Sequence, residues 1–168
     1  VFDMAAITHA AHGVGSKCGF DLAHAAGNIA LHLHNWNVDF ACWCSYKYLN
    51  SGPGGVSGIY INQKHIADTS IPRFAGWWGH TKDTRFKMEK GFEPIPTAEG
   101  WQLSNAPILS MAAHKASLDI FEEAGMEQLH AKREQLVAYL HYVLNDINSR
   151  QIEKILEIIT PATENERG

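Results

Sequence analysis

The sequence DFACWCSYKYLNSGPGG, residues 39–55, decides the fold of this chain. It begins with a short apolar run, 40–44, that ends abruptly at Ser45, Tyr46 and Lys47. A run of this length bounded by turn-forming residues is typical of a buried strand in a parallel sheet. The glycines that follow the lysine predict a sharp turn and a close backbone approach. The stretch therefore predicts an α/β fold.

A second short apolar run, 18–20, lies upstream and ends at Asp21, and His24 follows three residues later. Open α/β sheets bind ligands at the carboxyl ends of their strands. Two neighbouring strand ends would therefore bring Asp21, His24 and Lys47 to one crevice.

Together, these side chains predict a specific kind of chemistry. A lysine at the end of an apolar strand, beside the hydroxyl of Tyr46, can be desolvated enough to act as an amine nucleophile and form a Schiff base. A carboxylate from the neighbouring strand can keep the ring nitrogen of pyridoxal phosphate protonated, and a buried carboxylate is stabilised by such a cationic partner. Two simpler interpretations stay open at this point: Asp21 as a helix N-cap and Lys47 as a solvated loop lysine.

Composition limits the possible classes of function. The 168 residues, 45% of them hydrophobic, are enough for one ordinary domain with a real core. The formal net charge of −4 and the scattered basic residues argue against a nucleic-acid partner. No apolar run approaches the roughly 20 residues of a membrane span. Three cysteines, an odd number, do not suggest a disulfide framework, so we expect a cytoplasmic protein.

Hydrophobic periodicity predicts the remaining elements. In chain order they are a helix capped by Asp3, strands over 17–21 and 56–62, a helical turn over 63–68, helices over 107–125 and 126–147, and a strand over 154–160. Leucines and other apolar residues form one stripe on the 126–147 helix, which predicts a packing surface. Residues 70–105 contain three prolines and many aromatic residues, so a long functional loop is predicted there. Within it we interpret Arg85 and Lys87 as surface or interface charges.

Histidine and cysteine pairs raise the question of a metal site. His9 and His12 are three residues apart, and the pairs His32/His34 and Cys42/Cys44 are each two apart. No third ligand with suitable spacing accompanies the first pair, and small side chains on an apolar strand are more often buried in the core. We therefore predict no metal site, and we expect both cysteines, together with Trp36 and Trp43, to be buried packing residues.

Several motifs occur in an order that resembles a known family. They are DLAHAAGN (21–28), the opening stretch, GWWGH (76–80) with TRFKM (84–88), and LSNAP (103–107). The chain is similar to the pyridoxal-phosphate enzymes of fold type I in the class V aminotransferase group, and within it most similar to the kynureninases. The resemblance covers residues 1–168 and is densest over 19–105.

The resemblance implies a role for six residues. Lys47 is expected to hold pyridoxal 5'-phosphate covalently and to move protons, Asp21 to pair with the pyridine nitrogen, and His24 to lie against the ring. A simpler alternative for His24 is a hydrogen-bonded packing residue. Tyr46 is expected to bind the phosphate, and Trp77 and Asn105 to reach the cofactor, in this family often across a homodimer interface.

The resemblance also implies an activity. The family hydrolyses L-kynurenine, or its 3-hydroxy form, to anthranilate or 3-hydroxyanthranilate and L-alanine, in tryptophan catabolism and NAD biosynthesis. A class V aminotransferase or a cysteine desulfurase would share the pair formed by Asp21 and Lys47, although nothing here resembles the flexible loop that carries a desulfurase cysteine. A further alternative is a non-catalytic remnant that acts as an interaction module.

By the same resemblance, 1–125 is the second part of a cofactor-binding large domain, with a mostly parallel sheet flanked by helices, and 126–168 begins a small α/β domain. The loop that cradles the phosphate, the aromatic residue that stacks on the ring and the arginine that receives the substrate carboxylate are expected outside 1–168. We therefore predict that these 168 residues alone are a fragment, which is inactive and binds the cofactor weakly or not at all.

Overall fold

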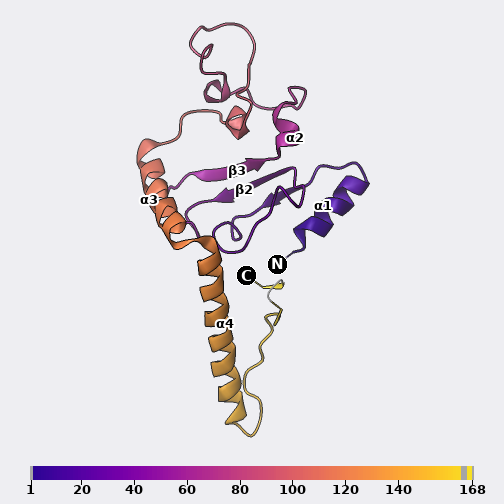
Figure 1. Cartoon of the computed structure of the whole chain (residues 1–168), viewed down its shortest axis with the longest axis vertical. Coiled ribbons are helices and arrows are strands. Elements are labelled where there is room, and N and C mark those ends of the chain that lie inside the picture. The colour runs from indigo at the N-terminus through magenta and orange to yellow at the C-terminus, as the bar shows by residue number, and fades with distance from the viewer. Residues whose placement is uncertain (1, 164–165, 168) are drawn as a thin grey trace.

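The computed structural model describes residues 2–163 and 166–167 as a small sheet with helices around it (Figure 1). In chain order the elements are α1 (Met4–Gly13), β1 (Gly19–Asp21), β2 (Phe40–Cys44), β3 (Ser57–Ile61), α2 (Gln63–Ile66), the 3₁₀ turns η1 (Trp77–Gly79) and η2 (Ala98–Trp101), α3 (Ile108–Ala124) and α4 (Met126–Ser149). Every helix and strand predicted before residue 150 is confirmed, with ends that differ by a few residues.

The sheet has the strand order β1-β2-β3. β1 runs parallel to β2, with Gly19 opposite Phe40 and Asp21 opposite Cys42. β3 runs antiparallel to β2, so only one of the two pairings is parallel. The reason is the connection over 45–56, which turns straight back without a helix, whereas a parallel neighbour needs a crossover. The α/β class is confirmed, and the parallel pair is the one that carries the predicted site.

The core lies between α1, the sheet and the turns after β1. Met4, Leu22 and Ala41 are buried there. The partly buried residues that pack around them are Phe20, Ala25, Ile29, Leu31, Leu33, Trp36, Trp43 and Tyr60, so the core positions predicted for the two tryptophans are confirmed. Asp3 caps α1 as predicted, because its carboxylate accepts a hydrogen bond from the Ala6 N–H at 2.9 Å.

The prediction for Cys42 is wrong. Its side chain is exposed, and Cys44 is only half-buried, whereas Cys18 is buried. Alternation along β2 explains the difference: Ala41 faces the core, while Phe40 and Cys42 lie on the opposite, uncovered face of the strand. Among the described residues, no three histidine, cysteine or acidic side chains are grouped so that they could hold a metal ion.

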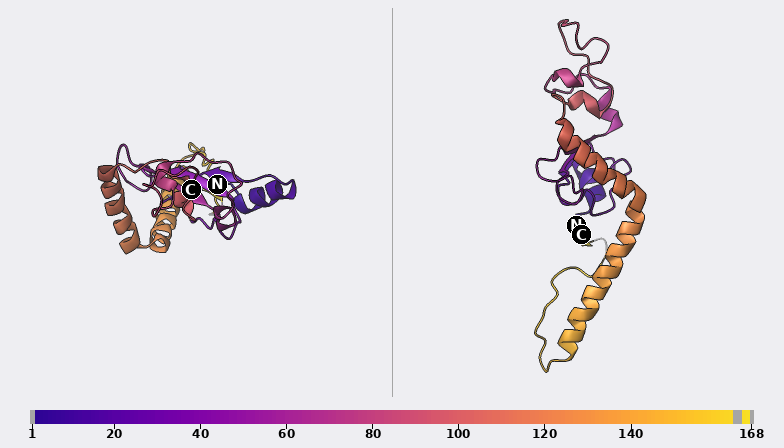
Figure 2. Two further views of the ribbon diagram at one scale, coloured as in Figure 1. Left: turned by 90° about the horizontal axis from the view of Figure 1, so that it is seen from above. Right: turned by 90° about the vertical axis from the view of Figure 1, so that its left-hand side faces the viewer.

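Helix α4 extends away from the sheet, and the segment after it returns alongside it (Figure 2). The strand predicted over 154–160 is wrong, since the structure gives this segment no strand. A strand needs a ladder partner, and here the backbone N–H groups of Ile155 and Leu156 bind the Asn148 side chain of α4 instead, at 3.2 and 2.9 Å. No helix in the described part of the chain is both long and apolar enough to cross a membrane.

Arginine side chains hold the long loop between α2 and α3. The Arg85 guanidinium lies 4.3 Å from the centre of the Trp78 ring and donates to the carbonyls of Trp78 and His80 at 2.6 and 3.1 Å. Arg73 stacks over Trp101 in the same way, at 3.8 Å. Arg85 is therefore half-buried and organises the loop from within, which corrects its prediction as a surface or interface charge; Lys87 is exposed, as predicted.

Candidate active site

The parallel pairing of β1 and β2 brings their carboxyl ends to the same edge of the sheet. The Leu22 N–H donates to the Cys42 carbonyl at 2.7 Å, so the ladder continues one residue beyond Asp21. Asp21 and the loop after Cys44 therefore leave the sheet side by side. This edge is where open α/β sheets bind ligands.

A cavity of about 460 Å³ lies at this edge. Asp21, His24 and Lys47 all line it, so three of the six predicted site residues lie together. Apolar side chains, including those of Phe20 and Leu22, form much of the remaining wall. A carboxylate, an imidazole and a primary amine thus share one partly apolar cavity, which is suited to an aromatic, charged ligand.

Asp21 has a second interaction within this site. Its Oδ1 accepts a hydrogen bond from the Ala23 N–H at 2.9 Å, so the carboxylate also caps the turn that follows β1. The capping interpretation and the ligand interpretation are therefore compatible. In this chain the Asp21 side chain is exposed and not buried, which differs from the expectation of a buried carboxylate.

The turn that carries His24 packs directly against the loop that carries Lys47. Gly27 has φ +80°, and a Cβ at this position would lie 2.8 Å from Cδ2 of Leu49. Only glycine combines this backbone conformation with so close an approach. The His24 side chain is exposed, so its ring is free of the packing role that was its simpler alternative, and the backbone carbonyl of His24 accepts from the Asn28 amide at 3.1 Å.

Helix α3 anchors the lysine loop from the other side. The hydroxyl of Ser117 donates to the carbonyl of Leu49 at 2.6 Å. Within the loop, the Asn50 N–H donates to the carbonyl of Lys47 at 3.1 Å and closes a turn. Lys47 itself is half-buried and is not a fully solvated loop lysine.

The other three predicted residues do not line this cavity. Tyr46 is 52% exposed. Trp77 is 49% exposed and contacts the rings of Trp78 and Phe86, each with centroids 5.5 Å apart. Asn105 is exposed, and its side-chain oxygen accepts from the Ser104 hydroxyl at 3.2 Å. Their roles toward the cofactor stay predictions.

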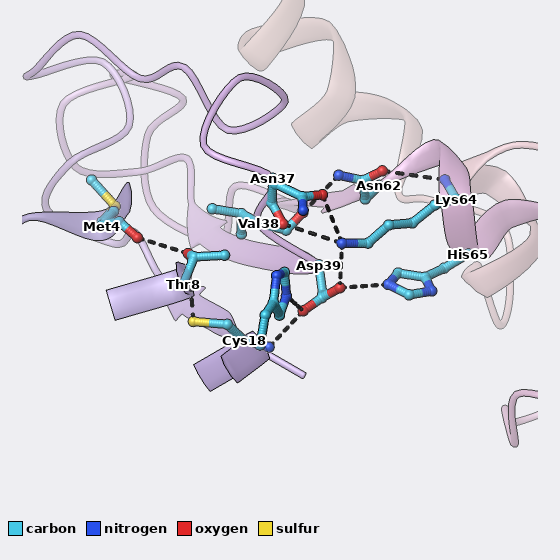
Figure 3. Close-up of polar contacts among 10 residues, drawn as sticks. Met4, Thr8, Cys18, Asn37, Val38, Asp39, Asn62, Lys64 and His65 are labelled. Carbon is cyan, nitrogen blue, oxygen red and sulfur yellow. Dashed lines mark hydrogen bonds and ion pairs between the residues drawn. The ribbon is translucent and has the colours of Figure 1, made fainter. Parts of the chain in front are cut away.

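Sequence analysis missed a buried charged centre at the opposite end of β2, around Asp39 (Figure 3). Asp39 is only 2% exposed. Its Oδ2 accepts from His12 Nε2 and from the Cys18 N–H, both at 2.7 Å. Its Oδ1 contacts His65 Nε2 at 2.6 Å and Lys64 Nζ at 2.8 Å. The sequence near Asp39 gives one local signal, an aspartate directly before an apolar strand. It does not reveal the four partners, because all of them are distant in the sequence.

The surroundings of Asp39 determine its protonation. Burial by itself raises the pKa of the carboxyl. The hydrogen bonds from Lys64, His65, the Cys18 N–H and His12 together outweigh burial and hold the pKa well below its ordinary value of 3.8. Asp39 is therefore a charged structural centre that joins α1, the sheet and α2, at the end of β2 remote from Lys47.

Comparison with known proteins relates these features to a family. The profile of the family described as Aminotransferase class-V matches residues 1–163. A kynureninase of Flavobacterium psychrophilum is 57% identical over 168 residues, which are 100% of this chain and 39% of that protein. A kynureninase of Nematostella vectensis is 49% identical over 174 residues, covering 99% of this chain and 37% of that protein. The chain thus spans well under half the length of these curated relatives.

Solved structures give the same fold. A cysteine desulfurase from Escherichia coli superposes with a TM-score of 0.61 at 17% identity, covering 89% of this chain and 35% of that one. An alanine–glyoxylate aminotransferase from Nostoc sp. superposes with a TM-score of 0.58 at 22% identity, covering 84% and 36%. At such identities the likeness shows the fold alone. The profile, which matches nearly the whole chain, establishes that this chain belongs to the class V aminotransferase family, which has the fold type I architecture of pyridoxal-phosphate enzymes.

Proposed function

We propose that this chain contributes the lysine, carboxylate and imidazole of an enzyme that hydrolyses L-kynurenine, or its 3-hydroxy form, to anthranilate or 3-hydroxyanthranilate and L-alanine. The observation that carries the proposal is the cavity lined by Asp21, His24 and Lys47 at the carboxyl ends of β1 and β2. Relatives named kynureninase, 49–58% identical across essentially the whole chain, support the substrate class.

The residues present fit pyridoxal phosphate. The cavity offers a primary amine that can hold an aldehyde covalently, a carboxylate for a cationic ring nitrogen, and apolar walls for a flat ring. When bound, pyridoxal phosphate supplies an electron-withdrawing ring that stabilises negative charge on the substrate's α-carbon.

Each residue of this chain has a defined task in the proposal. The Ala23 N–H holds Oδ1 of Asp21, and the carboxylate would accept a hydrogen bond from the protonated ring nitrogen. Lys47 would hold the aldehyde group through its amine and would move a proton at the substrate's α-carbon. His24 would lie against the ring, and Tyr46 would donate its hydroxyl to the phosphate.

The net reaction is a hydrolysis without oxidation or reduction. The bond between the carbonyl carbon of the aryl ketone and its neighbouring methylene carbon breaks. Water supplies the hydroxyl that turns the carbonyl carbon into the carboxylic acid, and a proton completes the methyl group of alanine. Lys47 would move a proton at the neighbouring α-carbon, since it lines the cavity where the amino acid would be held.

We extend the proposal to a cytoplasmic homodimer that acts in tryptophan catabolism and NAD biosynthesis. Exposed apolar side chains on the long loop and on α4, among them Trp77, Leu136 and Leu140, support association with a second copy. In such a dimer Trp77 and Asn105 would reach the partner's cofactor. The domain boundary is proposed at Gly125, where α3 ends and α4 begins.

The first prediction tests the lysine. In the protein expressed from its natural gene and supplied with pyridoxal phosphate, borohydride reduction should attach the cofactor to Lys47, as located by peptide mass spectrometry. Lys47→Ala should lose this attachment and lower anthranilate release from kynurenine by at least about a thousandfold, because the amine holds the cofactor and moves the proton. Lys87→Ala, at an exposed lysine of the long loop, serves as the matched control and should leave both unchanged.

Other outcomes would overturn the proposal. Sulfur release from cysteine, or amino transfer to a keto acid, without release of anthranilate would assign the chain to one of the other class V activities. Absence of any attached cofactor in the wild-type protein would favour the non-catalytic interaction module.

A further inference from the structure

Two buried serines frame the loop that carries Lys47. Ser45 directly follows β2 and is completely buried, and Ser51 is 4% exposed at the end of the loop. The Ser51 N–H donates to the Ser45 carbonyl at 3.1 Å, and the two hydroxyl oxygens lie 2.7 Å apart. These two contacts close the base of the loop formed by residues 45–51, and Lys47 is one of the residues of this loop.

The number of hydroxyl protons determines the direction of each bond. The Ser45 hydroxyl donates to the carbonyl of Val56, the residue before β3. A serine hydroxyl has one proton, so at the contact between the two oxygens Ser51 is the donor and Ser45 the acceptor. The chain of bonds runs from Ser51 through Ser45 to Val56, and it connects the end of β2, the lysine loop and the start of β3.

Glycine at position 55 leaves the space for this chain of bonds. A Cβ on Gly55 would lie 1.8 Å from the Ser51 hydroxyl oxygen and 3.0 Å from that of Ser45. The φ angle of Gly55 is not positive, so the reason for glycine here is the close approach of the two hydroxyls and not the backbone conformation.

We infer that Ser45 and Ser51 are positioning residues for Lys47, through the serine latch formed by their two hydroxyls and the Val56 carbonyl. The inference rests on the proposed role of Lys47. Neither serine lines the cavity, so the latch acts only by fixing the backbone from which the lysine extends. Displacement of a reacting group by about 1 Å can cost about a hundredfold in rate.

The test uses two substitutions that each remove one oxygen atom, Ser45→Ala and Ser51→Ala, in the protein expressed from its natural gene. In the cofactor-free protein, hydrogen exchange at the Ser51 amide should rise about tenfold or more, because its bond to the Ser45 carbonyl opens more often. In the loaded enzyme kcat should fall about tenfold to a hundredfold while KM changes less than about twofold. The exposed Ser57→Ala on the next strand is the matched control and should match the wild type in both measurements.

The double variant shows whether the two hydroxyls act together through one chain of hydrogen bonds or independently of each other. Because the hydroxyls act through each other, Ser45→Ala/Ser51→Ala should lose no more activity than the worse single variant. The inference would be overturned if the decreases in kcat of the two single variants multiplied in the double variant. It would also be overturned if the decrease in kcat only matched the fraction of unfolded protein.

The outcomes also distinguish this inference from the proposed function. If Lys47→Ala abolishes turnover but Ser51→Ala keeps kcat and amide exchange within about twofold of wild type, the latch inference alone fails. If Lys47→Ala retains turnover, the proposed function fails, and the positioning role fails with it, while amide exchange still reports whether the latch holds the loop.

Discussion

Among the single residues, Asp39 has the most concentrated set of polar contacts in the described chain. Four donors surround it, from α1, from the residue before β1 and from α2. Removing a carboxylate from water is costly unless its charge is fully matched, and here each oxygen has two partners. The residue therefore stabilises the relative placement of three segments and has no access to the cavity at Lys47.

This placement leads to a prediction on stability and pH. Since the pKa of folded Asp39 is depressed, its contribution is fully present above the unfolded value of 3.8 and is lost as pH falls below it. Asp39→Asn should lower the free energy of unfolding by about 3 kcal/mol at pH 7. The difference from wild type should shrink as the pH is lowered from about 5 toward 2. Urea unfolding at several pH values measures both effects.

Asp119 provides the control for this prediction. It is an exposed carboxylate on α3, paired with Lys115 at 2.6 Å and one helical turn away. Asp119→Asn should cost less than about 1 kcal/mol, because exposed ion pairs contribute little. An Asp39→Asn variant with the same pH slope as wild type would contradict the assignment of a charged structural centre.

At the residue scale, sequence reasoning had uneven success. Asp21, His24 and Lys47 could be predicted to meet because the resemblance and the parallel-strand rule indicate the same edge of the sheet. The Asp39 centre could not, because His12 and His65 reach it from 27 and 26 residues away. In the sequence, His12 stands out only by its spacing of three residues from His9.

At the scale of elements, the site depends on two turns that touch. The turn after β1 and the loop after β2 meet where Gly27 faces Leu49. Gly27→Ala should destabilise the protein by about 2 kcal/mol or more, because a residue with φ +80° is strained and the new methyl group meets Leu49. It should also reduce cofactor attachment at Lys47, since the two turns are pushed apart.

Gly15 separates these two causes. Its φ of +77° is nearly that of Gly27, but a Cβ placed at Gly15 would have no other atom within 4 Å. Gly15→Ala should show the backbone strain alone, about 1 kcal/mol by thermal unfolding, with cofactor attachment unchanged. Equal effects of both variants on attachment would mean that contact between the turns does not matter.

Predictability at this scale followed local periodicity. The helices α1, α3 and α4 and the strands β2 and β3 were predicted correctly because their apolar spacing and capping residues are local signals. The segment 154–160 failed because its apolar residues resemble a strand, but a strand also requires a neighbour, which no local pattern reveals. The antiparallel direction of β3 likewise depends on how the chain returns after Ser51.

At the scale of the whole molecule, α4 leaves an apolar face exposed. None of its residues is buried, and Leu136 and Leu140, two members of the predicted stripe, are 59% and 54% exposed. These two leucines lie one turn apart and so share one face of the helix. The packing surface that the periodicity predicts here stays a prediction, because only an assembled molecule can show what covers this face.

The proposed homodimer makes this face testable. Leu136→Lys/Leu140→Lys should shift the protein from dimer to monomer at micromolar concentration in analytical ultracentrifugation, because two charges would have to be buried at the interface. Ala138→Lys, at an exposed residue on another side of α4, is the control and should leave the dimer intact. A dimer that tolerates the double substitution would place the interface elsewhere.

The uncovered face of β2 carries an exposed thiol, and its rate of alkylation reports whether this face is covered. Cys42 is exposed on the middle strand of the sheet, whereas Cys18 is buried near α1. In the chain as described, iodoacetamide should alkylate Cys42 much faster than Cys18, by about tenfold or more, because thiol reactivity follows exposure. Denaturation should make the two rates equal. In the natural assembly, slow alkylation of Cys42 would show that another surface shields this side of the sheet, so the ratio of the two rates becomes a footprint of how the molecule is completed.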